Sequence, residues 1–96
     1  MTYIRFTWDQ KKSKANYEKH GISFEEAKSI FYDPAARQIY DPDHSADEDR
    51  FIMLGMSHKL RVFIVCHCYR EKEEKIRIIS ARKATAVETR LYERRR

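Results

Sequence analysis

The stretch RVFIVCHCYREKEEKIRIISA, residues 61–81, predicts two strands joined by a charged turn. The first strand, residues 61–69, contains the unbroken apolar run Val62–Cys66. Because such a run is typical of a strand buried on both faces, we expect this strand at the centre of a sheet. Residues 70–74 are all charged and form the turn, and residues 75–81 return as the next strand.

Side chains of a strand alternate between two faces, which assigns the residues of the second strand. Alternation predicts Ile76 and Ile78 on one face, and Ile79 and Ala81 on the other. Arg82 follows at the strand end, two residues from Ser80 and four from Ile78. We therefore expect Arg82 to continue the face of these two residues.

Three segments upstream of this hairpin also read as strands. Residues 50–56 form a strand ahead of a turn within residues 55–59, and residues 37–40 form a short one. Residues 3–8 alternate as a half-buried strand. The acidic segment 41–49 is interpreted as a solvated connection.

Two helices are predicted between the first strand and residue 34. Asp9 caps a helix over residues 10–20, and Gly21 ends it in the left-handed conformation. The capping box of residues 23–26 opens the second helix, and Asp33-Pro34 ends it, because the residue before a proline avoids helical dihedrals. The buried stripe of this helix is predicted to be Phe24, Ala27 and Phe31.

A last helix begins near Thr85, where Thr85-Ala-Val-Glu88 forms another capping box. Its inward side chains are predicted to be Ala84, Val87 and Leu91, with Arg90 and residues 94–96 outward. The element order is β-α-α-β-β-β-β-α. This order predicts one α+β domain over residues 1–96, an antiparallel sheet packed with two N-terminal helices and one C-terminal helix.

Charge is unevenly distributed along the 96 residues, whose formal net charge is +5. Residues 1–48 carry 7 Lys/Arg and 9 Asp/Glu, a net of −2, whereas residues 49–96 carry 13 and 6, a net of +7. A basic half of this kind indicates a polyanionic partner, such as a nucleic acid.

Several classes of protein are excluded by what the sequence lacks. The longest apolar run is far shorter than the roughly 20 residues of a membrane span, and no secretory signal pattern opens the chain. We therefore expect a soluble cytoplasmic protein that does not enter a membrane. With glycine only at Gly21 and Gly55, the chain has no nucleotide-binding loop, and we expect no cofactor.

The two cysteines, Cys66 and Cys68, leave the same face of one strand, where a disulfide between them is disfavoured. Cys66-His67-Cys68 lacks the paired ligand clusters of a zinc site, so no metal site is predicted. Cys66 in a core strand is also a poor nucleophile. Buried thiols are the interpretation that remains.

The remaining chemistry is a set of cations with a few histidines, carboxylates and tyrosines. Such a set can cleave RNA without a metal: the 2′-hydroxyl attacks the adjacent phosphate, a base and an acid move protons, and cations stabilise the charge at phosphorus. Four residues are candidates for catalysis: Arg82, Arg50, His67 and Glu88. Five are candidates for RNA binding: Arg61, Arg77, Lys83, Arg90 and Tyr92.

Each candidate also has an ordinary structural explanation. A strand end is a common place for a solvated arginine, which covers Arg50 and Arg82. A histidine within a central strand, such as His67, is often packed, and the capping box alone explains Glu88. His44 and Glu48 lie in the segment interpreted as solvated, so no role is assigned to them.

The order of several motifs resembles the BrnT toxin family over nearly the whole chain. The matching residues are Phe6-Thr-Trp-Asp9, Lys12, Asn16, Lys19-His20-Gly21-Ile22, Phe24-Glu25-Glu26-Ala27, Asp41-Pro-Asp-His-Ser45, Glu48, Arg50, Gly55, Arg77-Ile-Ile-Ser-Ala-Arg82, Ala84 and Glu88. Within this resemblance, Arg50 and Arg82 match positions that we link to activity. His67 and Tyr92 are not part of the motif.

The resemblance implies a type II toxin of a bacterial toxin–antitoxin pair, with a fold similar to the RelE-type ribonucleases. It implies RNA cleavage that inhibits translation, and neutralisation by an antitoxin in a complex of two toxins with two antitoxins. Operator DNA would be bound only through the antitoxin.

Two other functions are compatible with the residues alone. A non-catalytic nucleic-acid-binding module, such as an operon co-repressor subunit, would keep the basic face and tolerate loss of any proton carrier. A protein–protein adaptor would show little salt dependence in any association with RNA, whereas phosphate neutralisation gives a steep one.

Overall fold

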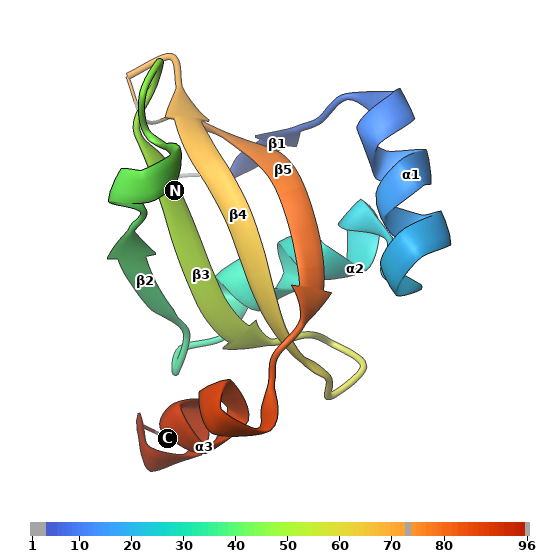
Figure 1. The fold of residues 1–96 in the computed structure, drawn as a ribbon, viewed down its shortest axis with the longest axis vertical. Coiled ribbons are helices and arrows are strands. Elements are labelled where there is room, and N and C mark those ends of the chain that lie inside the picture. The colour runs from blue at the N-terminus through green and yellow to red at the C-terminus, as the bar shows by residue number, and fades with distance from the viewer. Residues whose placement is uncertain (1–3, 73, 96) are drawn as a thin grey trace.

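The computed structural model describes residues 4–72 and 74–95 (Figure 1). The elements in chain order are β1 (Arg5–Thr7), α1 (Gln10–His20), α2 (Phe24–Lys28), the 3₁₀ turn η1 (Ser29–Tyr32), β2 (Arg37–Tyr40), the 3₁₀ turn η2 (Pro42–His44), β3 (Arg50–Met56), β4 (Val62–Arg70), β5 (Lys75–Lys83) and α3 (Ala86–Arg95). The predicted α+β class and element order are confirmed. Within the described residues, no helix has the length and apolar character needed to span a membrane.

The five strands form one sheet in the order β1-β5-β4-β3-β2. Strands β2 to β5 are antiparallel neighbours, with β4 at the centre as predicted. β1 pairs parallel to β5, so the sheet is mixed. Parallel pairing requires a long connection, and here both N-terminal helices and the other strands lie between β1 and β5 in the chain.

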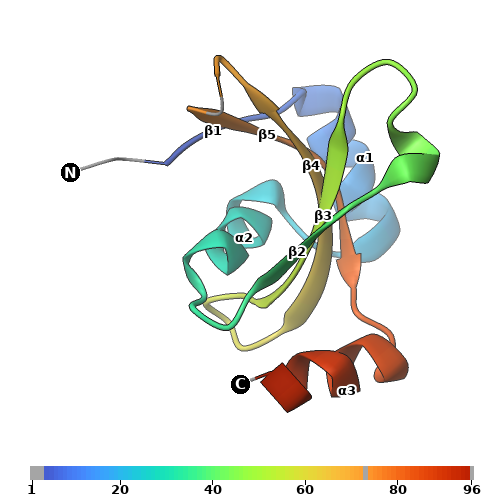
Figure 2. The same cartoon turned by 90° about the vertical axis from the view of Figure 1, so that its left-hand side faces the viewer.

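Helix α2 covers one face of the sheet, whereas the other face is covered in part, by α3 at one end of the strands, where Tyr92 packs with Leu54 and Ile64. Figure 2 shows α2 and the short green turn η2 on opposite sides of the sheet, with α3 beyond one end of the strands. In Figure 1, α1 flanks the sheet next to β5. The face opposite α2 is called the open face below.

The main core lies between α2, η1 and the covered face of the sheet. The predicted residues Phe24 and Ala27 are fully buried there, together with Ile30, while Phe31 packs at the margin of the core. They meet Phe63, Val65, Ile78 and Ala81 of the two central strands.

The predicted helix caps are present, with one difference. Asp9 Oδ1 accepts hydrogen bonds from the Lys11 and Lys12 amides, and Gly21 has φ +69°. Ser23 Oγ accepts from the Glu26 amide over 3.1 Å, but the Glu26 carboxylate does not complete the capping box. It turns into the fold instead, toward Ser57 and Arg61.

A β-bulge in β5 changes which face each of its later residues occupies. Cys66 pairs with Ser80 and His67 pairs with Ile78, which leaves Ile79 as an extra residue. Ala81 therefore joins Ile78 in the core, and the predicted pairing of Ala81 with Ile79 on one face is wrong. Arg82 shares its face with Ser80, as predicted, but not with Ile78.

The rotation of α3 also differs from the prediction. Val87 is 58% exposed and Leu91 41%, whereas Tyr92 is 2% exposed and donates a hydrogen bond from its hydroxyl to Asp33 Oδ2 over 2.6 Å. The capping box is formed, and Glu88 is held toward the sheet by Arg82. Because residues four apart share a helix face, Tyr92 follows Glu88 inward and Leu91 is left outside.

The β3–β4 turn lies two residues later than predicted, over residues 57–61. Gly55 is part of β3, where a Cβ would lie 3.1 Å from the Cβ atoms of both Ile30 and Ala36. The glycine therefore permits the close approach of η1 to the sheet rather than forming a turn. The first strand is shorter than predicted, and Tyr3 lies outside the described residues.

Candidate functional site

The strand register places rows of side chains across the open face. One row runs Arg37, Leu54, Ile64 and Arg82 from β2 to β5, and the adjacent row runs Ile39, Ile52, Cys66 and Ser80. Side chains directly opposite on neighbouring strands lie about 5 Å apart, so each row is continuous. Two arginines thus flank an aliphatic strip.

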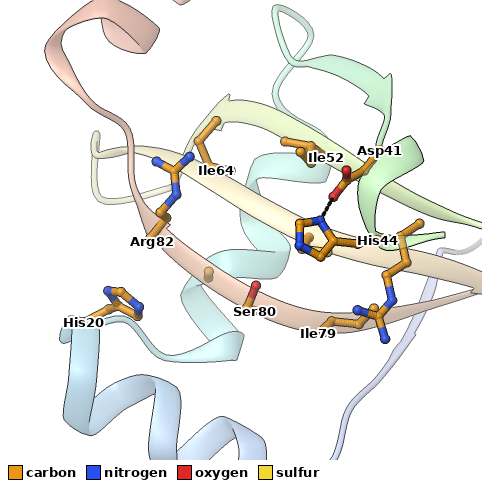
Figure 3. Close-up of a pocket in the computed structure, with 11 residues that line it drawn as sticks. His20, Asp41, His44, Ile52, Ile64, Ile79, Ser80 and Arg82 are labelled. Atoms are coloured by element: carbon orange, nitrogen blue, oxygen red, sulfur yellow. Dashed lines mark hydrogen bonds and ion pairs between the residues drawn. The ribbon is translucent and has the colours of Figure 1, made fainter. Parts of the chain in front are cut away.

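A pocket of about 300 Å³ lies over these rows and is lined by both Arg50 and Arg82. We call it the arginine pocket; it is lined by His20, Asp41, His44, Arg50, Ile52, Ile64, Cys66, Ile79, Ser80, Ala81 and Arg82. Figure 3 shows His20 and Arg82 at one end and the Asp41–His44 pair at the other, with Ser80 between them. Residues from α1, η2 and three strands therefore meet at this pocket.

Asp41 and His44 form an oriented pair on η2. Asp41 is buried, and its Oδ2 accepts a hydrogen bond from Nδ1 of His44 over 2.8 Å. The backbone of Asp41 is fixed by its amide, which donates to the Arg50 carbonyl over 2.9 Å. The His44 side chain is 66% exposed, so its other ring nitrogen is accessible for proton transfer.

The sequence contains a signal for the Asp41–His44 pair, which we did not recognise when we interpreted residues 41–49 as a solvated connection. Side chains three residues apart in a 3₁₀ turn lie on the same side. In Asp41-Pro-Asp-His44 the proline follows the aspartate at the first position of such a turn, where its fixed φ is tolerated. This spacing joins the carboxylate to the imidazole.

Arg82 and Glu88 form a bidentate ion pair at the other end of the pocket. The two guanidinium nitrogens donate to Oε1 and Oε2 over 2.8 and 2.9 Å. Hydrogen bonds from Arg82, with a further one from the Thr85 amide, lower the pKa of Glu88 to about 2. Glu88 is therefore ionised at neutral pH and holds the Arg82 guanidinium in place.

Arg50 has a different environment from Arg82. Its backbone amide donates to Ser45 Oγ over 2.9 Å, and its side chain forms no ion pair within residues 4–72 and 74–95. A guanidinium without a carboxylate partner is available for an anion, and its planar donor group fits a phosphate. The pocket thus holds one fixed arginine and one available arginine.

Comparison with known proteins now identifies the family. The model of the family described as "Ribonuclease toxin, BrnT, of type II toxin-antitoxin system" matches residues 8–88. The chain belongs to the BrnT toxin family. The matched range includes η2, Arg50, Arg82 and Glu88, and every residue that lines the arginine pocket.

A solved structure supports the same assignment. The chain is similar to the ribonuclease toxin BrnT of Brucella abortus, with 25% sequence identity and a TM-score of 0.64. The match covers 86% of this chain and 99% of the other. No curated protein matches the chain. BrnT family members are ribonuclease toxins of type II toxin–antitoxin systems, which implies an antitoxin partner.

His67, a predicted catalytic residue, is not in the arginine pocket of this BrnT chain. It lies on the covered face, is fully buried, and packs against Phe31, Phe51 and Tyr69. Burial lowers its pKa from the ordinary value of 6.5 to about 4. We therefore assign His67 to the core and not to proton transfer in the pocket.

The buried His67 predicts a specific loss of stability in mild acid. Because its folded pKa is depressed, the unfolded chain takes up a proton first, and the stability present above pH 6.5 is lost as pH falls toward 4. Urea unfolding should show a loss of roughly 3 kcal/mol over this range. The variant His67→Leu should lack this dependence between pH 6.5 and 4.5, and parallel pH curves for the two proteins would contradict the assignment.

The five predicted RNA-binding residues divide into two groups. Arg61 is paired with Glu26, and Tyr92 is buried, so its ring is not presented for stacking on a base. Arg77 is half-buried, Lys83 and Arg90 are exposed, and none of the three forms an ion pair within the described chain. These three remain available to a phosphate backbone.

Both cysteines are free thiols, Cys68 buried and Cys66 half-buried. Burial raises the pKa of both Cys66 and Cys68, which keeps the thiols protonated at neutral pH. Both point to the open face, whereas His67 between them points to the covered face, so the three cannot bind one ion together.

Asn16 is one of the residues of the family motif, and its side chain binds the edge of β5 next to the pocket. Its Nδ2 donates to the carbonyls of Ile22 and Ala81 over 3.1 and 3.0 Å, and its Oδ1 accepts from the Ala81 amide over 3.0 Å. The side chain thus pairs with β5 as a strand would, beyond the end of β1 and next to the bulge. This contact fixes the segment that carries Ser80 and Arg82.

We expect Asn16→Ala to destabilise the protein by about 2–4 kcal/mol, because three buried backbone groups lose their partners. Chemical unfolding measures the loss, with Lys14→Ala on the exposed surface of α1 as the matched control. A loss below about 1 kcal/mol, within the range of a single ordinary hydrogen bond, would show that water replaces these contacts.

Proposed function

We propose that this chain is an endoribonuclease that cleaves RNA in the arginine pocket by attack of a 2′-hydroxyl on the adjacent phosphate. The reaction needs no metal ion in this proposal, because Arg50 and Arg82 supply the positive charge at phosphorus. The observation that carries it is that these two arginines and the oriented Asp41–His44 pair line one pocket.

Each residue has a distinct role. Arg82, fixed by Glu88, and Arg50 bind the scissile phosphate and stabilise the charge that develops on it. His44, oriented by Asp41, takes the proton of the 2′-hydroxyl as the 2′-oxygen bonds to phosphorus. His20, across the pocket, protonates the leaving 5′-oxygen as its bond to phosphorus breaks (Figure 3). The products are a 2′,3′-cyclic phosphate and a 5′-hydroxyl.

The remaining parts of the proposal concern partners and place of action. Arg77, Lys83 and Arg90 would follow the phosphate backbone of the RNA. Cleavage would inhibit translation in the cytoplasm, carried out by the single toxin domain of residues 1–96. A cognate antitoxin would neutralise the toxin in a complex of two copies of each protein, and only the antitoxin would contact operator DNA.

Induction of the protein in a bacterial culture tests this function. The wild type and the control Lys14→Gln should arrest growth and fragment total RNA, whereas Arg50→Gln should do neither. Circular dichroism of the purified Arg50→Gln protein checks that it is folded. Intact RNA and unchanged growth with well-expressed wild type would overturn the proposal, and fragmentation that persists in Arg50→Gln would remove Arg50 from the site.

A further inference from the structure

A second hollow, of about 280 Å³, lies beside the arginine pocket, between α3 and the open face. We call it the apolar slot. Leu54 and Ile64 form its floor, and Ile39 of β2 and Leu91 of α3 line it from opposite sides. Ile39 is 52% exposed and Leu91 41%, so these two aliphatic side chains face solvent in this chain.

The slot and the arginine pocket are continuous. Ile52, Ile64 and Arg82 line both of them. The two rows of the open face that they occupy are separated by two residues along each strand, or about 7 Å. A phosphate bound at Arg82 therefore lies within one nucleotide of the slot.

The chemistry of the slot fits a nucleobase. A base has apolar faces, which aliphatic walls can cover, and polar edges that need donors and acceptors. Arg37 at the rim offers donors and forms no ion pair within the described residues. The Glu88 carboxylate, ionised at neutral pH, offers an acceptor at the same rim.

We propose that the apolar slot binds the nucleobase next to the scissile phosphate, between Ile39 and Leu91. The proposal rests on RNA cleavage in the arginine pocket. A segment of a partner protein is the other occupant that an exposed apolar slot suggests. RNA is favoured because the slot shares Arg82 with the arginine pocket and carries a second arginine, Arg37, at its rim.

The test uses RNA with one abasic nucleotide immediately 5′ or 3′ of a mapped cleavage site, and it compares kcat/KM for three proteins. These are the wild type, Leu91→Ser, and the matched control Val87→Ser, which changes another exposed aliphatic residue of α3 outside the slot. We expect Leu91→Ser to lower kcat/KM about tenfold on intact RNA, because the base loses its apolar contact with the leucine side chain. One of the two abasic positions should slow the wild type similarly.

The inference is tested by combining the Leu91→Ser substitution with the abasic RNA. On the sensitive abasic RNA, Leu91→Ser and wild type should cleave at equal rates, because the contact is already absent, while Val87→Ser follows the wild type throughout. Equal cleavage of intact RNA by Leu91→Ser and wild type would overturn the inference and leave the ribonuclease function standing. If Leu91→Ser cleaves intact RNA like the wild type but no longer binds the antitoxin, the slot is a binding site for the antitoxin instead. No cleavage of any RNA by wild type would overturn the function and the inference together.

Discussion

Replacing His44 by alanine is expected to slow RNA cleavage by about 10²–10⁴-fold, the usual contribution of a positioned acid or base. His44 lies in the arginine pocket, and its Nδ1 is held 2.8 Å from Asp41 Oδ2. The hydrogen bond fixes the ring orientation and leaves the other nitrogen to receive a proton. The measurement is the single-turnover rate on a labelled RNA, with enzyme in excess.

Two further variants separate catalysis from incidental change. His58→Ala alters an exposed histidine of the β3–β4 turn, which does not line the arginine pocket, and should cleave at the wild-type rate. Asp41→Asn should slow cleavage while RNA binding is retained, because it disturbs the orientation of His44. A rate for His44→Ala within threefold of wild type would remove this histidine from the reaction.

Loss of Arg61 is expected to cost about 3 kcal/mol of folding stability at neutral pH, at the low end for a broken buried ion pair. Glu26 is 3% exposed, and it accepts hydrogen bonds from Ser57 Oγ over 2.7 Å and Arg61 Nε over 2.9 Å. Arg61→Met keeps the aliphatic stem but leaves the carboxylate buried without its cation. The guanidinium is partly solvated, which is why the lower figure applies.

The pH dependence of this variant provides a second readout. In the wild type, hydrogen bonds from Arg61 lower the pKa of Glu26, so its contribution to stability is present above the ordinary carboxyl range and is lost as pH falls. In Arg61→Met the buried carboxylate takes up a proton more readily, and the deficit relative to wild type should shrink toward pH 4. Adding Glu26→Gln should restore part of the stability at pH 7. A deficit that is unchanged with pH would contradict the ion-pair account.

The strands and helices could be predicted from local patterns because each carried its own signal. The boundaries of β2, β3 and α1 match the predicted ranges, and Asp9 and Gly21 act as the expected caps. Alternation and capping are local effects, and the structure retains them. The direction of β1 could not be predicted in this way, because its partner β5 is about 70 residues distant in the chain.

The errors have a common cause in contacts between distant segments. The bulge at Ile79 places Ala81 in the core, and Asn16 of α1 holds that segment in place. Likewise, the Tyr92 hydroxyl donates a hydrogen bond to Asp33, 59 residues earlier in the chain, and this contact helps to turn Tyr92 of α3 inward. Neither of these hydrogen-bonding contacts can be predicted from the local sequence pattern of the segment that it affects.

Only part of the candidate pocket could be predicted from the sequence. Arg50 and Arg82 were chosen as candidates from their positions at strand ends and from the family motif, and both line one pocket in the structure. His67 lies outside that pocket, because alternation along β4 puts it on the face opposite Cys66. The Asp41–His44 pair was not recognised from the sequence, because it is apparent only when residues 41–44 are read as a 3₁₀ turn.

Cleavage of an RNA with a single 2′-deoxy nucleotide at a mapped site, in the presence of a metal chelator, tests the central claim most directly. The account predicts that the protein cleaves the all-ribose RNA under these conditions and leaves a 2′,3′-cyclic phosphate and a 5′-hydroxyl. The linkage that follows the 2′-deoxy nucleotide should remain intact. Cleavage at that linkage, or products that end in a 3′-hydroxyl and a 5′-phosphate, would contradict attack by the 2′-hydroxyl in the arginine pocket.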